Sequence, residues 1–246
     1  MDWDILFEIH KDMPRQGAGR NKYTKKAFEM IPKINTSLIL DIGCGPGLQT
    51  IYLAKISKGN VIGIDIHQPY LDNLNKLAER DDLQDKIKTI KMSMMEMDFP
   101  EEHFDIIWAE GSIFVIGFEN GLKQWKKYIK PNGFLAVHEM TWLKDNPPKE
   151  LNDWWQKVYP EIKTIDEDLK IIDKCGYKLL GHFALPEDAW WDLYYTPLEK
   201  RLKVLKEKYK DNLKFQEAIR LEEEEIELFR KYNEWYGSVF YVMQKK

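Results

Sequence analysis

A glycine-rich segment, LDIGCGPGLQT from Leu40 to Thr50, has the residue types that cradle a nucleotide-like ligand. It follows a short β-rich run and opens a helix, so backbone amides and the positive end of the helix point at the same place. Glycines at 43, 45 and 47 let the backbone approach a ligand without a Cβ in the way. Asp65 ends the next apolar run, where an acidic side chain binds ribose hydroxyls.

The spacing of these glycines is GxGxG, which differs from the GxGxxG of the dinucleotide fingerprint. Asp41 stands just before the first glycine. A carboxylate there stabilises the positively charged amino group or sulfonium region of a ligand and repels a pyrophosphate. The pattern therefore favours a nucleotide-like methyl donor over the other ligands of Rossmann folds.

Alternating apolar runs and helical patterns surround this segment. Continuous apolar runs separated by helices indicate a parallel sheet covered on both faces, and thus a doubly wound α/β fold. The predicted strands are 37–43, 60–65, 87–92, 104–110 and 133–140, followed by 177–185 and 238–244. The predicted helices between them are 48–58, 70–80 and 121–129, and the last ends in a KPNG turn.

A long charged segment, 192–236, separates the last two predicted strands. It contains the strongly helical stretch LEEEEIELFRKYNEWYG, which Gly237 stops. We expect a helical insertion within a single domain of residues 1–246. The insertion is either a lid over the site or a pair of packing helices, because both have the same sequence pattern.

Composition excludes several classes of protein. Lys and Arg total 37 against 41 Asp and Glu, a net charge of −4, and the basic residues alternate with acidic ones instead of forming a stripe. This pattern argues against a nucleic-acid partner. Two cysteines, 44 and 175, form neither a disulfide framework nor a zinc motif, so we predict no metal. Without an apolar run of membrane length or a signal peptide, we expect a cytoplasmic protein that does not bind membranes.

The motifs resemble, in order and spacing, those of class I S-adenosylmethionine-dependent methyltransferases. The resemblance runs from about Leu38 to Trp142 and is carried by LDIGCGPG, VIGIDIHQPYLD, SMMEMDFPEEHFDIIWAEGS and IKPNGFLAVHEMTW. It implies S-adenosylmethionine as cofactor and a Rossmann-like sheet of seven strands, mostly parallel with an antiparallel last strand. Arg15-Gln16-Gly17-Ala18-Gly19 and the block from Glu110 to Trp125 resemble a subgroup of small-molecule methyltransferases.

The resemblance assigns the methionine part of the cofactor to the glycine loop and to the start of the chain. Gly43, Cys44 and Gly45 are expected to pass under the methionine part. Gln16 and Gly17 are expected to fold over the cofactor from outside, as part of a helical, cofactor-covering segment 1–36.

The same resemblance assigns the adenosine part to two further segments. Asp65 is expected to hold the ribose, with Ile66 against the adenine and Ser93 and Met94 flanking it. Many relatives have Asp in place of Ser93, and a serine makes a weaker hydrogen bond to the adenine amino group. Glu110 is expected to face the methyl donor or the acceptor.

Three residues near predicted strand ends are candidates for catalysis. Glu110 ends one strand, and its alternative role is to cap a helix or bind water. His138 and Glu139 lie near the end of the next strand and point to opposite faces, so at most one faces the pocket. Histidine transfers protons near neutral pH, but a single histidine there is also often structural.

The predicted function is methyl transfer to a small-molecule acceptor by in-line displacement. Aromatic side chains follow the fifth and sixth strands and would either line an acceptor pocket, for a flat, apolar or cationic molecule, or pack in the core. One alternative is a cofactor-binding protein without catalysis, acting as a sensor or partner subunit. A nucleic-acid or protein methyltransferase is another, and the chain could act as a homodimer.

Overall fold

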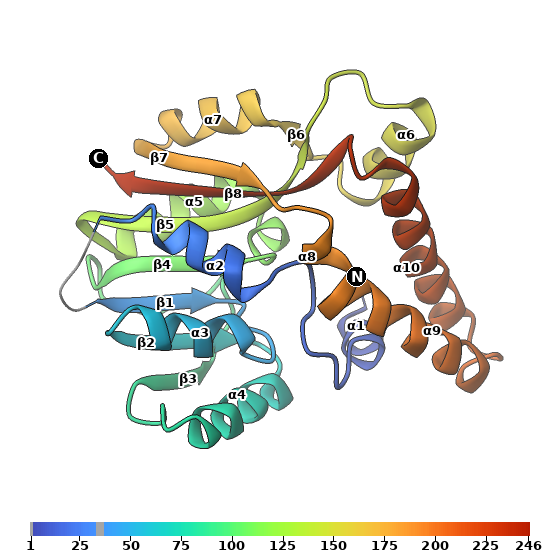
Figure 1. Cartoon of the computed structure of the whole chain (residues 1–246), viewed down its shortest axis with the longest axis horizontal. Helices are drawn as coiled ribbons and strands as arrows, with labels where there is room; N and C mark the ends of the chain where they lie inside the picture. Colours follow the sequence, from blue (N-terminus) through green and yellow to red (C-terminus); the bar gives the residue numbers. More distant parts are fainter. Residues whose placement is uncertain (1, 33–36) are drawn as a thin grey trace.

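The apolar runs form one mixed β-sheet in the computed structural model of the chain, which describes residues 2–32 and 37–246 (Figure 1). The strand order is β3-β2-β1-β4-β5-β8-β7, with β6 paired to β5. Strands β1 to β5 are parallel, and β8 runs antiparallel to both β5 and β7. The strands are β1 Leu38–Ile42, β2 Asn60–Asp65, β3 Ile87–Lys91, β4 Phe104–Glu110, β5 Ile129–Trp142, β6 Lys163–Thr164, β7 Tyr177–Ala184 and β8 Tyr236–Lys245.

This arrangement confirms the Rossmann-like doubly wound fold and the antiparallel last strand. The chain moves outward from β1 to β3, returns to β4 beside β1 and continues to β5, so the order reverses between β1 and β4. Ligands of such sheets bind beyond the carboxyl ends of the strands at this reversal. The sheet has an eighth strand that we did not predict, because two residues give no periodic pattern: β6 pairs through Lys163 and Thr164 with the end of β5.

The start of β5 also differs from the prediction. The strand begins at Ile129 instead of residue 133, and the preceding helix α5, Phe118–Trp125, ends four residues earlier than predicted and continues as a 3₁₀ turn, η2, Lys126–Tyr128. Ile129 pairs with Phe104 and Phe134 with Ile106, so the KPNG turn lies within β5 as an irregularity of the ladder. The extra residues bulge out of the sheet there.

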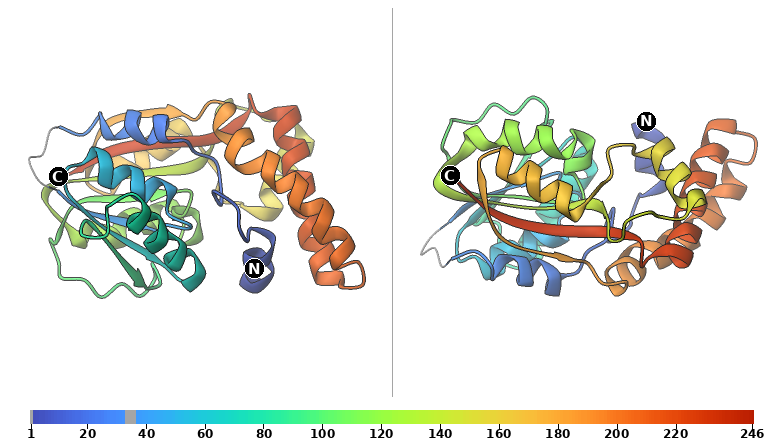
Figure 2. Two further views of the ribbon diagram at one scale, coloured as in Figure 1. Left: turned by 60° about the horizontal axis from the view of Figure 1, so that its bottom comes forward. Right: turned by 90° about the horizontal axis from the view of Figure 1, so that it is seen from above.

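Helices cover both faces of the sheet, as Figure 2 shows. One hydrophobic core packs α2, α3 and α4 against one face, and a second packs α5 and α7 against the other. Within β5, even-numbered residues such as Phe134 and Ala136 belong to the first core, and odd-numbered ones such as Leu135 and Val137 to the second. These helices are α2 Asn21–Phe28, α3 Leu48–Ile56, α4 Gln68–Arg80, α5 Phe118–Trp125 and α7 Ile165–Lys174.

The predicted helical insertion between the last two long strands is confirmed. A short α-helix, α8 (Asp188–Trp190), leads through a π-helical turn, η3 (Trp191–Tyr195), into α9 (Thr196–Lys208) and α10 (Leu213–Tyr232). Tyr236 already belongs to β8, so the insertion ends one residue before the predicted boundary, and its last helix ends at Tyr232. The pair α9–α10 projects from the sheet beside α6, Lys149–Val158 (Figure 1).

The start of the chain reaches this insertion. Helix α1, Trp3–Ile9, lies beside α9, and Arg201 of α9 donates from Nε to the Ile9 carbonyl at 2.6 Å. Arg20 forms ion pairs with Asp188 at 2.9 Å and with Asp192 at 2.7 Å. Of the predicted segment 1–36, residues 1 and 33–36 lie outside the described residues.

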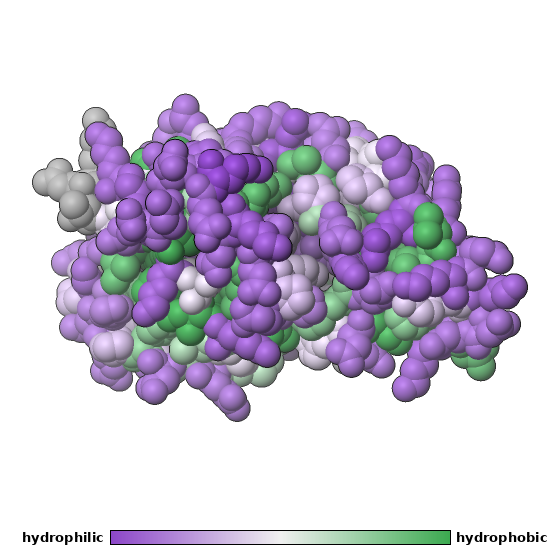
Figure 3. Space-filling model, turned by 90° about the horizontal axis from the view of Figure 1, so that it is seen from below, coloured by the Kyte–Doolittle hydropathy of each residue, from purple (hydrophilic) through white to green (hydrophobic). Residues whose placement is uncertain are grey.

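Hydrophilic side chains predominate on the molecular face of Figure 3, where hydrophobic residues form separated groups. Among the residues with described structure, no helix combines the length and apolar character that crossing a bilayer requires.

Phe240 of β8 packs in the first core against His138. We expect Phe240→Ala to lower the free energy of unfolding by about 3–5 kcal/mol, because it leaves a cavity in that core. Its ring is fully buried and packs against Trp108, His138 and Phe183 at centroid distances of 5.8, 5.0 and 5.4 Å. Urea unfolding measures the loss. The matched control is Val204→Ala on α9, whose side chain is 66% exposed. A loss at Phe240 no larger than that of the control would contradict the packing described.

Candidate functional site

The glycine loop between β1 and α3 forms a tight backbone cradle. Gly43 and Cys44 both donate their backbone N–H to the Ile64 carbonyl, at 2.9 and 3.0 Å, which ties the loop to the end of β2. Gly47 starts α3 with φ of 98°, and Gly43 has φ of 68°; both angles disfavour any residue with a Cβ. A Cβ at Gly43 would lie 2.6 Å from the Ser112 Cβ, so the loop is also closely covered from the end of β4.

Asp65 connects the glycine loop to the end of β2. Its carboxylate accepts from the Gly45 N–H at 3.0 Å and from the His67 N–H at 2.9 Å. Burial raises the pKa of Asp65, and these two backbone donors partly offset the rise. Each carboxylate oxygen still has accepting capacity for a ligand hydroxyl. The next residue, Ile66, is 39% exposed, which leaves an apolar surface beside this carboxylate.

Asp41 lies fully buried at the end of β1. One carboxylate oxygen accepts from the Thr50 hydroxyl at 2.6 Å, and the other has no hydrogen-bond partner within the described structure. Burial raises the pKa of Asp41 to about 7. A buried oxygen without a donor is costly unless a ligand supplies one, so this atom fits the predicted contact with a cationic amino group.

The segment before α2 lies over the glycine loop. A Cβ at Gly45 would be 3.6 Å from the Gln16 Cγ, and the Gln16 side chain accepts from the Tyr70 hydroxyl at 2.7 Å. Phe7 of α1 stacks on His67, with ring centroids 3.8 Å apart. A Cβ at Gly17 would meet nothing within 4 Å, so space remains beside that residue. This geometry agrees with a segment that covers a ligand held on the loop.

Ser93 and Met94 follow β3 and are partly buried. The Ser93 hydroxyl accepts from the Met95 N–H at 3.2 Å and remains able to donate. The Met94 side chain reaches the glycine loop, because a Cβ at Gly43 would lie 3.6 Å from its Cε. The backbone N–H of Met92, directly before them, donates to the Asp65 carbonyl at 3.1 Å, so both residues follow a strand end held beside Asp65. Their contact with adenine remains a prediction.

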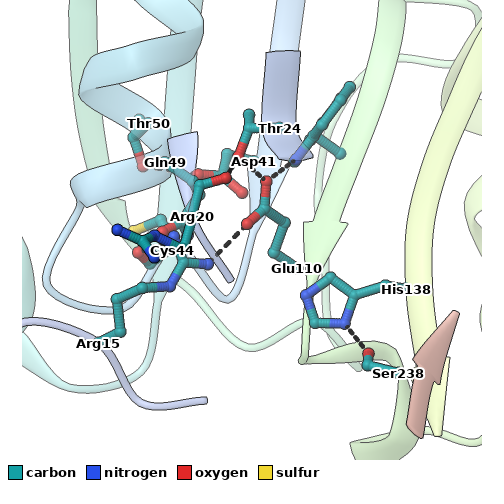
Figure 4. A network of polar contacts seen from close by, with 11 residues as sticks. Arg15, Arg20, Thr24, Asp41, Cys44, Gln49, Thr50, Glu110, His138 and Ser238 are labelled. Atoms are coloured by element: carbon teal, nitrogen blue, oxygen red, sulfur yellow. Dashed lines mark hydrogen bonds and ion pairs between the residues drawn. The ribbon is translucent and has the colours of Figure 1, made fainter. Parts of the chain in front are cut away.

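Glu110 at the end of β4 accepts three hydrogen bonds, one of them from a buried arginine (Figure 4). Arg15 donates to one carboxylate oxygen at 2.6 Å, while the Thr24 hydroxyl and the Trp108 indole N–H donate to the other at 2.7 and 3.0 Å. Although burial opposes ionisation, the Arg15 charge and these donors hold the pKa of Glu110 below its usual value. The Glu110 carboxylate is thus ionised, and both of its oxygens already accept hydrogen bonds from the protein. Through Arg15 it anchors the segment before α2 to the sheet.

His138 is the neighbour of Glu110 across the sheet, since the two are paired in the ladder between β4 and β5. The distance from its Nδ1 to the Ser238 hydroxyl is 2.5 Å, and its Nε2 is buried with no partner in the described part of the chain. Burial lowers the pKa of His138 to about 4, so the imidazole is neutral at pH 7. Its Cε1 would lie 3.2 Å from a Cβ at Gly111, directly after Glu110.

Glu139 points to the opposite face of β5, as the alternation of a strand requires. One of its oxygens accepts from the Met140 N–H at 2.9 Å. Burial raises the pKa of Glu139 to about 8, with Asp168 adding to the rise. The Asp168 carboxylate accepts hydrogen bonds from the hydroxyls of Tyr241 and Thr141, and Tyr241 belongs to the second core. The structure therefore brings Glu110 and His138 together and separates Glu139 from them.

Two groups of polar residues escaped the sequence analysis. Arg15 occurs in the RQG motif, but its partner Glu110 is 95 residues away and no local pattern joins them. The second group is Glu222 and Glu225 of α10, and the spacing of Glu222 in the sequence could have revealed its position. Glu222 falls three residues after Ile219 and four before Ile226, both buried, which puts a glutamate on the apolar face of the helix.

Over residues 2–32 and 37–246, no group of three or more His, Cys, Asp or Glu side chains has an arrangement that could hold a metal ion. Cys44 and Cys175 are both buried and free.

Comparison with known proteins shows which part of the chain resembles a known family. Residues 39–133, which span β1 to the start of β5, match the family described as "Methyltransferase domain". A sterol 24-C-methyltransferase of Kluyveromyces lactis is 28% identical over 171 residues, which cover 65% of this chain and 46% of that protein. The chain thus spans about half the length of the curated relatives it matches.

Solved structures with a similar fold match over almost the whole chain. A methyltransferase from Thiobacillus denitrificans, described as S-adenosylmethionine-dependent and in complex with S-adenosyl-L-homocysteine, has a TM-score of 0.82. It is 15% identical, and the match covers 98% of each chain. The cyclase SpnF is similar with a TM-score of 0.76 at 16% identity, covering 99% of this chain and 92% of that one. At these identities the likeness concerns the fold.

The fold is that of class I S-adenosylmethionine-dependent methyltransferases, and residues 39–133 match the methyltransferase domain family. Both findings confirm the resemblance read from the motifs. Membership in the subgroup suggested by the RQG and EGSI motifs stays a prediction.

Because the Arg15–Glu110 ion pair is buried, we expect the effects of replacing its two residues on the free energy of unfolding to be strongly coupled. We expect Arg15→Met and Glu110→Gln each to lower the free energy of unfolding by about 3–5 kcal/mol, because each leaves a buried partner uncompensated. The double variant should lose less than the sum of the two. Urea unfolding of the four proteins measures this, with Arg80→Met as the control, whose ion pair with Asp81 is exposed. Additive losses would show that the pair contributes no coupling.

Proposed function

We propose that this protein binds S-adenosylmethionine and transfers its methyl group to a small-molecule acceptor. The observation that carries the proposal is the cradle of glycine loop and Asp65: positive-φ glycines, a buried carboxylate oxygen on Asp41 without a donor, and an exposed Ile66 beside the Asp65 carboxylate. These groups complement an amino acid, a ribose and an adenine in that order along the loop. The match to the methyltransferase domain family covers all of them.

We propose that different residues of this chain bind the methionine, ribose and adenine parts of the cofactor. Gly43, Cys44 and Gly45 supply backbone under the methionine part, and Asp41 offsets its positive amino group. Asp65 accepts from the ribose hydroxyls. The adenine lies against Ile66, flanked by Ser93 and Met94, and Gln16 and Gly17 close the site from outside.

When bound, the cofactor supplies an electrophilic methyl group on a sulfonium centre. The protein then has to align an acceptor atom with that carbon, about 3 Å away, and keep water out. Of the three candidates, His138 has a buried neutral Nε2 able to accept a hydrogen bond or proton, and it shares a face of the sheet with Glu110. We propose that His138 orients the acceptor and that Glu110 positions the segment of Arg15. Glu139, on the other face, remains a candidate for a structural or indirect role.

A second candidate function is binding of the cofactor without methyl transfer. The similarity to the cyclase SpnF favours keeping it, because the same fold there carries a protein described by another reaction. A nucleic-acid or protein methyltransferase is less supported, since no basic stripe accompanies the site. Formation of S-adenosylhomocysteine with a mixture of small acceptors separates methyl transfer from binding alone. A homodimer, and an acceptor that is neither nucleic acid nor membrane, remain predictions.

Replacing Asp65 tests the cofactor. We expect S-adenosylmethionine and S-adenosylhomocysteine to bind in calorimetric titration and NAD not to bind. Asp65→Ala should weaken both adenosyl compounds by about 10–100-fold, because the ribose loses a charged acceptor. Asp85→Ala, an exposed aspartate after α4, is the control and should bind as the unmodified protein does. Binding of NAD alone would end the proposal of a methyltransferase.

The raised pKa of Asp41 predicts that cofactor affinity depends on pH. Only the ionised carboxylate attracts a cationic amino group, and its pKa of about 7 means that ionisation is lost as pH falls below 7. We therefore expect the affinity for S-adenosylhomocysteine to rise by up to about tenfold from pH 6 to pH 8 and to level off above. Titration across this range measures the trend. Asp41→Asn should flatten it, and an unchanged slope in that variant would assign the dependence to another group.

A further inference from the structure

Two glutamates of α10 differ from the others on the same helix. Glu217, Glu223, Glu224 and Glu227 each form an ion pair, and their partners are Arg220, Lys206 and Arg230. Glu222 and Glu225 form no ion pair within the described residues. Both are partly buried, and burial raises the pKa of each carboxyl, further at Glu225 through the charge of Glu222.

Two tyrosines lie beside these glutamates. The Tyr195 hydroxyl donates to Glu225 at 2.8 Å, and that is the one hydrogen bond recorded for either carboxylate in the structure as described. Tyr194 lies close enough for both carboxylates to raise the pKa of its hydroxyl. Its ring stacks against Tyr195, with centroids 4.9 Å apart.

His10 completes this cluster from the end of α1. Its ring stacks with Tyr194 at a centroid distance of 6.0 Å, and the charge of Glu225 acts on it to raise its pKa against the effect of burial. Its Nδ1 lies 3.0 Å from the Leu6 carbonyl of its own helix, which makes Nδ1 the protonated nitrogen and directs the Nε2 lone pair away from α1. Nε2 has no hydrogen-bond partner among residues 2–32 and 37–246, although His10 is only 4% exposed.

Among the described residues, no lysine or arginine forms an ion pair with Glu222 or Glu225. The guanidinium of Arg201, whose charge acts on His10, donates to the Ile9 and Glu8 carbonyls at 2.6 and 2.5 Å and is held at the end of α1. The buried His10 Nε2 without a partner is costly, and two carboxylates without a counter-charge lie near the same tyrosine rings; a ligand with a positive charge and N–H donors complements both.

The cluster is connected to the glycine loop. The Gln16 amide donates to the His10 carbonyl at 3.2 Å, and the same side chain lies over Gly45. Gln16 therefore links the residue that carries the His10 imidazole to the proposed cofactor position. The aromatic residues 194 and 195 belong to the segment after β7, where the sequence analysis left a cationic acceptor open.

We propose that Glu222, Glu225, Tyr194 and His10 bind the positively charged nitrogen of the methyl acceptor, so that the substrate is an alkylammonium compound. This inference rests on the proposed methyl transfer and specifies its substrate class. The charged nitrogen makes charge-assisted contacts with the two glutamates and a cation–π contact with Tyr194, and it donates a hydrogen bond to His10 Nε2. For methylation of that nitrogen, His10 Nε2 would take one of its protons, the freed lone pair would form the bond to the methyl carbon, and the electrons of the broken S–C bond would stay on sulfur in S-adenosylhomocysteine.

Binding of small cations tests the proposal directly. The probes are ethylammonium, tetramethylammonium and choline, each titrated into the protein saturated with S-adenosylhomocysteine, with 3,3-dimethylbutan-1-ol as the uncharged counterpart of choline. At least one cation should bind, and the alcohol should bind about tenfold more weakly than choline or not at all. Glu222→Gln and Glu225→Gln should each weaken cation binding about tenfold or more. Glu227→Gln, an exposed position on the same helix, should leave it unchanged.

Stability separates a binding role from a structural one. If the glutamates serve a ligand, their replacement removes an unfavourable buried charge, so Glu222→Gln should unfold at a higher urea concentration at pH 8 while binding cations less well. Glutamine at 225 still accepts from Tyr195, which preserves that contact. A lower urea midpoint with unchanged cation binding would overturn the proposal and make the pair structural.

A methylation assay is the third test of the proposed substrate class. An acceptor mixture of alkylamines, phenols and carboxylic acids should yield methylated product from the amines. Absence of binding by all three cations, or methylation confined to phenols or acids, would overturn the assignment of substrate class. In either case, retained binding of S-adenosylhomocysteine leaves the proposed function standing, whereas its loss would remove the basis of both.

Discussion

The ion pair between Arg15 and Glu110 is the contact on which the site depends. Both side chains are almost completely buried, and a lone carboxylate at the end of β4 would not remain ionised there. The arginine supplies the missing charge from a segment that has no strand or helix of its own at that point. Because Gln16 and Gly17 follow Arg15 directly, the same contact determines where the cover over the glycine loop lies.

The sheet separates ionisable groups by the alternation of its strands. Glu110 and His138 are neighbours on one face, whereas Glu139 lies on the other with Thr141, Asp168 and Tyr241. Burial affects the two sides differently. On the first, Arg15 compensates the carboxylate and the histidine is neutral; on the second, no arginine or lysine contacts Glu139 among the described residues, and burial favours its protonated form.

The parts predicted well from sequence are those in which local pattern and global fold agree. The glycine loop, Asp65 and the long apolar strands carry their own periodicity, and each was found within a few residues. The β5 boundary was wrong because the KPNG turn, usually a stop signal, forms a bulge inside a paired strand. The partner of Arg15 and the setting of Glu222 depend on contacts between segments far apart in the chain, which no window of the sequence contains. The roles of Glu110, His138 and Glu139 in chemistry stay predictions.

The attachment of α1 to α9 affects how the protein is made. Arg201 bonds the carbonyl of Ile9 across 192 positions of sequence. At a synthesis rate of about 5–20 residues per second, the first helix emerges about 10–40 seconds before the helix that holds it. Strands β1 to β5 and the glycine loop can assemble during that interval, whereas α1 has no docking partner, and the sheet lacks β8, until the insertion and the strand after it leave the ribosome. Docking of α1 therefore comes late in synthesis, after Arg15 can already reach Glu110, and such a long-range contact also forms slowly on refolding.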